Sequence, residues 1–245
     1  PMVLEMPVLT SRRRKTLIEA RIPFVIPGKQ IYLPFLGTML TEKCDAETTG
    51  IGPDKLRPSA QQLLFAMILD GCHPMPLAPL AKRFQVSAMT ITRAADQLCK
   101  TDLIKKIGMG SGAQKMLITE YSPKELYQKM RPYLIQPVRK TVYIDKADVH
   151  PEMFPAGLFS LSEMSMLNPP AIQTWGTVRF SLEKGSYTGT LLDTNKQCAL
   201  QVWKYDPRMI SQTKMVDVLS LALSLAEDED ERTQQCLEEL TERIW

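Results

Sequence analysis

The stretch LAPLAKRFQVSAMTITRAADQL, residues 77–98, constrains the fold of this chain more than any other segment. Apolar residues recur at helical spacing on each side of a short break, which predicts two helices joined by a tight turn. The residues expected to face inward are Leu80, Ala81 and Phe84 on the first helix, Val86 in the turn, and Ile91, Ala94 and Leu98 on the second. Ser87 stands where its side chain can cap the second helix by accepting a backbone N–H.

The opposite side of the second helix should face outward, because its apolar side is buried. The residues expected to contact DNA there are Ser87, Met89, Thr90, Thr92, Arg93 and Gln97. Such a face can enter the major groove, where arginine pairs with guanine and glutamine with adenine. Gln85 occupies a turn position where many helix-turn-helix proteins have glycine. The turn must therefore use a backbone conformation that glycine adopts more readily.

Two β-rich runs, LIKKI and KMLITE, follow these helices and flank the glycine-containing segment 108–114. They predict a hairpin, and two helices followed by a hairpin indicate a winged helix. The hairpin residues expected to contact DNA are Lys105, Lys106, Ser111 and Lys115. Gly108, Gly110 and Ala113 loosely match a dinucleotide-binding fingerprint, but that motif requires a helix after the glycines, and a β-rich run follows here.

Residues from about 59 to 120 resemble the MarR-like winged-helix regulators. The resemblance rests on Leu80, Val86, Ser87, Thr90, Arg93 and Leu98, which are followed by Leu103-Ile104 and the wing. It implies a sequence-specific transcriptional regulator that binds double-stranded DNA. The alternative is a winged helix that makes only protein contacts. The polar outward face and the basic hairpin favour DNA.

Charge divides the chain into two unlike parts. Residues 1–146 hold 22 Lys and Arg against 12 Asp and Glu, a net +10, and residues 147–245 hold 8 against 15, a net −7. Clustered cations bind polyanions by releasing counterions from phosphates. The basic part is therefore the expected DNA-binding part, although two ordinary solvated surfaces would show the same counts.

The N-terminal region predicts a helix over residues 11–20 and a hairpin around Pro27-Gly28, followed by a linker over residues 42–58. The basic cluster at residues 12–15 fits either a contact with the DNA backbone or a solvated helix face. Ser59 and Gln62 form a capping-box pattern that predicts the start of the next helix.

Further along the chain, Ser122 and Glu125 predict a helix that begins near Pro123 and is kinked or ended by Pro132. The segment VDVLSLALSLAEDEDERTQQCLEEL predicts two helices joined near the acidic run 227–231. Trp203 and Tyr205 are expected to pack these helices onto a strand.

These patterns together predict an α+β protein with three parts. Residues 1–58 form a helix and hairpin extension with a linker, residues 59–146 a winged-helix DNA-binding domain, and residues 147–245 an α+β interaction domain. The whole chain, including GLFSLSEMSML and WKYDP, also loosely resembles the antitoxin and regulator proteins of the type IV abortive-infection class. That resemblance implies an autoregulated operon and a toxin partner for the acidic domain. The alternative role for that domain is dimerisation or ligand binding.

No motif in the sequence indicates an enzyme, a cofactor or a metal site. Phosphate-binding loops, nucleophile elbows and paired C-x-x-C motifs are absent, and two histidines are too few for the common acid–base schemes. Five scattered cysteines suit reduced thiols and a cytoplasmic location. The longest apolar run, residues 63–69, is far shorter than a membrane span. A dimer would read DNA half-sites about one helical turn apart, whereas a monomer would read a single site.

Overall fold

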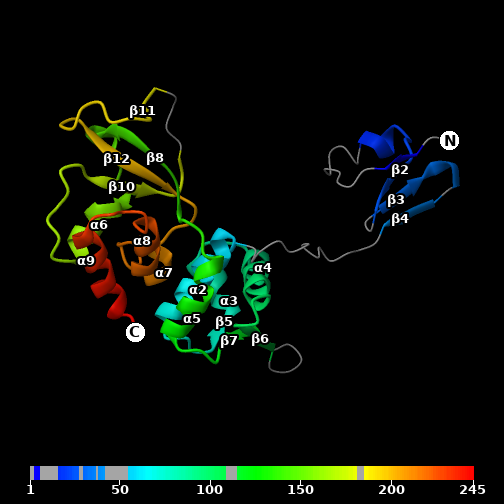
Figure 1. The fold of residues 1–245 in the computed structure, drawn as a ribbon, viewed down its shortest axis with the longest axis horizontal. Coiled ribbons are helices and arrows are strands. Elements are labelled where there is room, and N and C mark those ends of the chain that lie inside the picture. The colour runs from blue at the N-terminus through cyan, green and yellow to red at the C-terminus, as the bar shows by residue number, and fades with distance from the viewer. Residues whose placement is uncertain are drawn as a thin grey trace. The chain divides into compact units, whose positions relative to one another are not determined.

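The computed structural model describes residues 3–5, 16–27, 30–36, 38–41, 55–108, 115–180 and 185–245. The chain forms two compact units, residues 1–52 and residues 53–245. The described elements combine helices with three sheets, so the predicted α+β class is confirmed (Figure 1). The basic cluster 12–15, Ser111 and most of the predicted linker lie outside the described residues.

The first unit contains a four-stranded sheet. Its strands, in order across the sheet, are β1 (Leu4–Glu5), β2 (Phe24–Ile26), β3 (Gln30–Leu33) and β4 (Thr38–Thr41). Strands β2 and β3 pair antiparallel, which confirms the hairpin predicted around Pro27-Gly28. Residues 16–19 are helical, and the 3-10 helix η1 (Pro34–Leu36) precedes β4. The ring of Phe24 is buried and lies 5.6 Å from that of Tyr32.

The second unit begins with a helical group and a small sheet. Its helices are α2 (Pro58–Leu69), α3 (Leu77–Arg83), α4 (Ala88–Cys99), α5 (Pro123–Met130) and the 3-10 helix η2 (Arg131–Tyr133). Strands β5 (Met75–Pro76), β7 (Lys115–Ile118) and β6 (Lys105–Gly108) form an antiparallel sheet with β7 at its centre. The Ser122–Glu125 capping box starts α5 as predicted, and α5 gives way to η2 at Arg131, next to Pro132.

The helix predicted near Ser59 is confirmed as α2, but its predicted capping box is wrong. The helix begins at Pro58, its N-cap is Arg57, and no side chain caps it. Proline suits the first position of a helix, because its φ is already helical and its missing N–H would have no helical partner. Ser59 therefore lies inside the first turn. The amide of Gln62 donates to the backbone oxygen of Asp206 at 3.1 Å instead of completing a capping box.

Helix α2 is the centre of the core of this unit. Its residues 60–68 are all buried, so neighbours cover it on every side. Helices α3, α4 and α5 contribute part of that cover, and so do α7 (Arg208–Ser211) and α8 (Val218–Ser224). Tyr205, Ile210 and Leu219 belong to the same core cluster as α2. Residues from the acidic part of the chain therefore complete the core of the basic part.

A five-stranded sheet forms the other side of this unit. Its strands, in order, are β11 (Tyr187–Thr188), β8 (Val138–Asp145), β12 (Gln197–Trp203), β10 (Thr174–Thr177) and β9 (Phe154–Pro155). Strands β8 and β12 are antiparallel, whereas β10 and β12 are parallel. A Cβ added at Gly176 would lie 2.3 Å from the ring of Phe154, so only glycine allows β9 to pair this closely. The 3-10 helix η3 (Lys146–Asp148) follows β8.

The remaining helices are α6 (Gly157–Met164), α7 (Arg208–Ser211), α8 (Val218–Ser224) and α9 (Glu231–Glu242). Helices α8 and α9 flank the acidic run 227–231, which confirms the prediction of two helices there. Trp203 of β12 is buried against α6, α8 and α9, whereas Tyr205 packs into the α2 cluster. Helices α7 and α8 lie between the five-stranded sheet and helices α2 and α5 (Figure 1).

Candidate nucleic-acid interface

Helix α4 is held by the apolar face that its sequence predicts. Ile91, Ala94 and Leu98 are buried, and so are Leu80 and Phe84 of the preceding helix segment. Ala81 and Val86 are half-buried and pack against the same cluster. The backbone N–H of Thr90 donates to the Ser87 hydroxyl at 3.2 Å, which confirms Ser87 as the N-cap.

The turn between α3 and α4 uses a left-handed residue. Gln85 has a φ of +52°, a conformation that L-residues other than glycine and asparagine seldom adopt. Its backbone N–H donates to the Lys82 carbonyl at 3.2 Å, and the N–H of Val86 donates to the Ala81 carbonyl at 3.0 Å. These bonds end α3 and direct the chain into α4.

Two large side chains stand on the outer face of α4. Met89 is 59% exposed, which is high for a large apolar side chain. Arg93 lies four residues further along the helix and is also exposed. Within the described part of the chain, its guanidinium makes no hydrogen bond or ion pair. All of the donors of Arg93 are therefore available to a ligand.

The other predicted contact residues of α4 already have partners. The hydroxyl of Thr90 lies 2.9 Å from that of Ser87, and the hydroxyl of Thr92 donates to the Ala88 carbonyl at 3.0 Å. The Gln97 amide bridges two backbone groups, accepting from the N–H of Arg57 at 3.0 Å and donating to the carbonyl of Lys55 at 3.2 Å. Gln97 thus fixes the chain before α2.

The hairpin lysines differ in their surroundings. Lys105 forms an exposed ion pair with Glu120 at 2.8 Å. This contact raises the pKa of Lys105 and lowers that of Glu120. Lys106 pairs with Asp96 of α4. Lys115 at the start of β7 is exposed and has no such partner among the described residues. Lys115 can therefore bind a phosphate without first giving up a carboxylate partner.

No group of three or more metal-binding side chains occurs among the described residues. Four of the five cysteines are described, and all four are free thiols. Burial raises the pKa of Cys72 to about 11, and it also raises the pKa of Cys99 and Cys198. Thiols of this kind are poor nucleophiles, because the thiolate is the reactive form.

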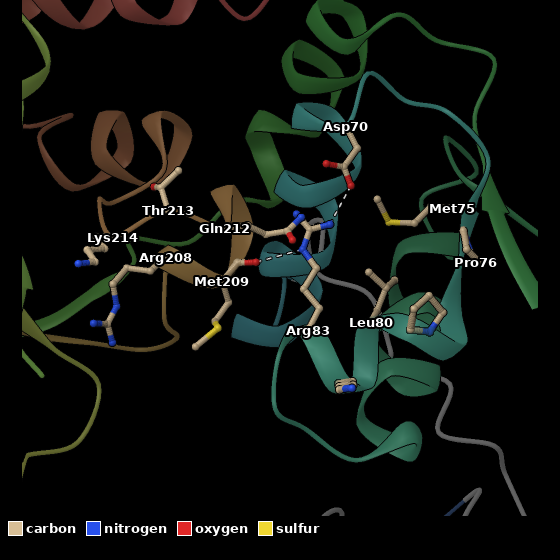
Figure 2. Close-up of a pocket in the computed structure, with 12 residues that line it drawn as sticks. Asp70, Met75, Pro76, Leu80, Arg83, Arg208, Met209, Gln212, Thr213 and Lys214 are labelled. Atoms are coloured by element: carbon tan, nitrogen blue, oxygen red, sulfur yellow. Dashed lines mark hydrogen bonds and ion pairs between the residues drawn. The ribbon is translucent and has the colours of Figure 1, made fainter.

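Arg83, at the end of α3, is a structural residue that the sequence did not single out. Its guanidinium pairs with Asp70 at 2.9 Å and donates to the Met209 carbonyl at 3.1 Å (Figure 2). It also donates to the Ile210 carbonyl. No local pattern points to this role, because the acceptors are carbonyls more than 120 positions away in the sequence. Arg83 therefore fixes α7 against α3.

No helix in the described part of the chain combines the length and the apolar character that crossing a bilayer requires. Comparison with known proteins gave no match to any protein-family model, curated protein or solved structure. The function is therefore inferred from the geometry of this chain.

Proposed function

We propose that this chain is a sequence-specific transcriptional regulator that binds double-stranded DNA through a winged helix. The elements α2, β5, α3, α4, β6 and β7 follow one another in the order of that fold. The three-stranded sheet β5-β7-β6 ends in the β6–β7 hairpin, which would be the wing. Helix α4 would be the recognition helix.

The observation that carries the proposal is the exposed Arg93 on α4. A guanidinium without a protein partner can donate two hydrogen bonds to O6 and N7 of guanine in the major groove. The buried positions Ile91 and Ala94 on either side of Arg93 fix the helix on its core. The arginine is thus presented by a rigid element, which favours the reading of a base over a loose electrostatic contact.

The wing would supply contacts to the DNA backbone. Lys115 can bind a phosphate directly, whereas Lys105 and Lys106 would first exchange Glu120 and Asp96 for a phosphate. The Lys105–Glu120 pair is exposed, and exposed ion pairs contribute little stability, so this exchange costs little for Lys105. The net +10 of residues 1–146 would add attraction that does not depend on sequence.

The competing function is protein binding by the same face. An exposed methionine such as Met89 suits a protein partner as well as a thymine methyl group. Arg93, which forms no ion pair within the described chain, and a hairpin with three lysines favour the nucleic acid. The two functions differ in salt dependence, because counterion release makes DNA binding weaken steeply as salt increases.

The test is a titration of the full chain with duplexes that tile the region upstream of its own gene, repeated with a scrambled duplex. We expect one duplex to bind at least about 10³-fold more tightly than the scrambled one at the same salt concentration. We also expect both affinities to fall between about 50 and 200 mM salt. A chain that binds none of these duplexes in that range would overturn the proposal.

A second proposed function is the binding of a basic protein partner by the acidic part of the chain. Helix α9 exposes Glu238, Glu239 and Glu242, and of these Glu242 pairs with Lys124 at 2.7 Å. A toxin encoded beside this chain would be such a partner. The test is binding of the neighbouring gene product to the full chain and to a Glu238→Lys, Glu239→Lys variant. Equal affinities would remove the acidic face of α9 from this function.

A further inference from the structure

A cavity of about 890 Å³ lies between two parts of the second unit. One wall is formed by β5, α3 and the end of α2, and the other by α7 and the turn after it (Figure 2). Its volume falls within the range of about 300–1,000 Å³ that is usual for small-molecule sites. Contacts with DNA in the proposed function do not use these walls.

The floor of the cavity is apolar. Met75 and Leu80 are buried residues that line it, and the side chains of Pro76, Pro79 and Met209 surround them. An apolar surface of this kind favours an aromatic ring or a short hydrocarbon chain over water.

The rim of the cavity is positively charged. The ionisable residues that line it are Lys82, Arg83, Arg208, Lys214 and Asp70. Arg83 is neutralised by Asp70, and Arg208 forms an ion pair with Asp206 at 2.7 Å. Lys82 and Lys214 are exposed, and in the described chain neither has a carboxylate partner. Two uncompensated cations therefore remain, one on each wall.

Arg83 keeps the two walls in place. Its guanidinium crosses from α3 toward α7, with bonds to Asp70 and to the carbonyl of Met209 (Figure 2). It also donates to the carbonyl of Ile210. Each of its three nitrogens donates one hydrogen bond, so Arg83 acts as a fixed side of the cavity. The site is thus held open before any ligand arrives, which reduces the entropy lost on binding.

We propose that this cavity binds a small amphipathic organic anion. The apolar ring or chain would lie on Met75 and Leu80, and a carboxylate, sulfonate or phosphate group would face the rim, where Lys82 and Lys214 supply positive charge. Hydrogen bonds from charged donors to such a group are among the stronger ones in proteins. The proposal concerns ligand binding alone and does not depend on DNA binding.

The test uses two fluorescent probes with the same ring system and the full-length chain. One probe, 8-anilinonaphthalene-1-sulfonate, carries an anion, and the other, N-phenyl-1-naphthylamine, is neutral. We expect the anionic probe to bind about tenfold more tightly than the neutral probe. The preference for the anionic probe should disappear in two double variants. One is Lys82→Gln with Lys214→Gln, and the other is Lys82→Glu with Lys214→Glu. In the double variant Lys100→Glu, Lys196→Glu, which changes two exposed lysines outside both proposed sites, the preference for the anionic probe should remain.

The location of the probe is checked with methyl-labelled methionine. Addition of the anionic probe should shift the methyl signals of Met75 and Met209, which line the cavity. Met166 is 98% exposed and does not line it, so its signal should stay in place. Equal affinity for the two probes, unchanged affinity in the glutamine variant, or shifts at Met166 without shifts at Met75 and Met209 would each overturn the proposal.

Discussion

The amide nitrogen of Gln61 donates to the phenol oxygen of Tyr205 at 3.1 Å, across 144 positions of the sequence and inside the core. The same amide also exchanges hydrogen bonds with the backbone of Ile135, donating at 2.9 Å and accepting at 2.7 Å. The Tyr205 hydroxyl is also hydrogen-bonded to the Ser220 hydroxyl, with 2.8 Å between the two oxygens. A polar chain therefore links α2, the segment after β12 and α8.

Removing the Tyr205 hydroxyl should destabilise the second unit. The change Tyr205→Phe leaves a donor of Gln61 and the hydroxyl of Ser220 without this partner in a buried site. We expect a loss of about 1–3 kcal/mol in the free energy of unfolding, measured with urea. Tyr143→Phe is the matched control, because Tyr143 is half-buried and its hydroxyl has no hydrogen bond within the described chain. If Tyr205→Phe loses no more free energy of unfolding than Tyr143→Phe, the Tyr205 hydroxyl does not stabilise the core.

Asp217 should make stability fall as pH rises. Its Oδ1 accepts from the Ser220 N–H at 2.9 Å, and its buried Oδ2 has no hydrogen-bond partner in the described structure. Burial raises its pKa from 3.8 to about 7. The folded chain thus holds a proton that the unfolded chain releases between these pH values. The contribution of Asp217 to stability is therefore fully present below about pH 4. As pH rises to about 7, the free energy of unfolding decreases by on the order of 1 kcal/mol per pH unit.

The variant Asp217→Asn keeps the cap oxygen and cannot ionise, so it should lose this dependence. Its stability relative to the wild type should increase from pH 4.5 to pH 8 in urea titrations. Asp230→Asn is the matched control, because Asp230 also caps a helix but is exposed. The Thr233 N–H lowers the pKa of Asp230, so its contribution is lost as pH falls. Parallel curves for the wild type and Asp217→Asn would refute the prediction.

Glycine at position 85 should stabilise the turn before α4. Gln85 has a φ of +52°, and the change Gln85→Gly removes the steric cost of that conformation. The gain should be up to about 1 kcal/mol, because the added freedom of the unfolded chain offsets part of it. Gln128→Gly, at an exposed position inside α5, should instead cost about 0.5–1 kcal/mol. Thermal unfolding measures both, and a destabilised Gln85→Gly would be evidence against this account.

Arg93 should determine one base of the DNA site. The change Arg93→Ala should cost about 1–3 kcal/mol of discrimination at one position, because a bidentate contact with guanine is lost. Arg93→Lys keeps the charge but not the forked donor, so it should lose most of that discrimination and retain more of the non-specific affinity. Affinities for matched and mismatched duplexes at one salt concentration provide the measurement. An unchanged ratio in Arg93→Ala would mean that Arg93 reads no base.

The wing lysines should set the salt dependence of binding. We expect Lys115 to bind a phosphate directly. Lys115→Ala should therefore reduce the slope of log affinity against log salt by about 0.9. Glu120→Gln should act in the opposite direction, because it releases Lys105 from its ion pair. Lys196→Ala, at an exposed lysine between the last two strands of the chain, is the control and should leave the slope unchanged. If Lys115→Ala also leaves the slope unchanged, Lys115 does not contact a phosphate.

The sequence predicts the parts of this structure that depend on neighbouring residues. The buried face of α4, the Ser87 cap and the capping box of α5 each follow from residues within two helical turns of one another. The helix α2 was predicted correctly, but its cap was not, because Pro58 starts the helix one residue before Ser59.

Contacts between distant polar residues could not be predicted in this way. Gln97 was expected on the outer face of α4, and its position on the helix allows that role. Its amide instead binds Lys55 and Arg57, about 40 positions earlier. A glutamine that reads a base and one that holds a backbone have the same periodicity, so the pattern alone does not separate them.

Helix α7 shows how such a distant contact determines local structure. It spans only Arg208–Ser211, and a single turn of helix is unstable in an isolated chain. Two of its carbonyls receive their donors from Arg83, whose bond to Met209 crosses 126 positions. The helical form of this segment therefore depends on α3 being docked beside it.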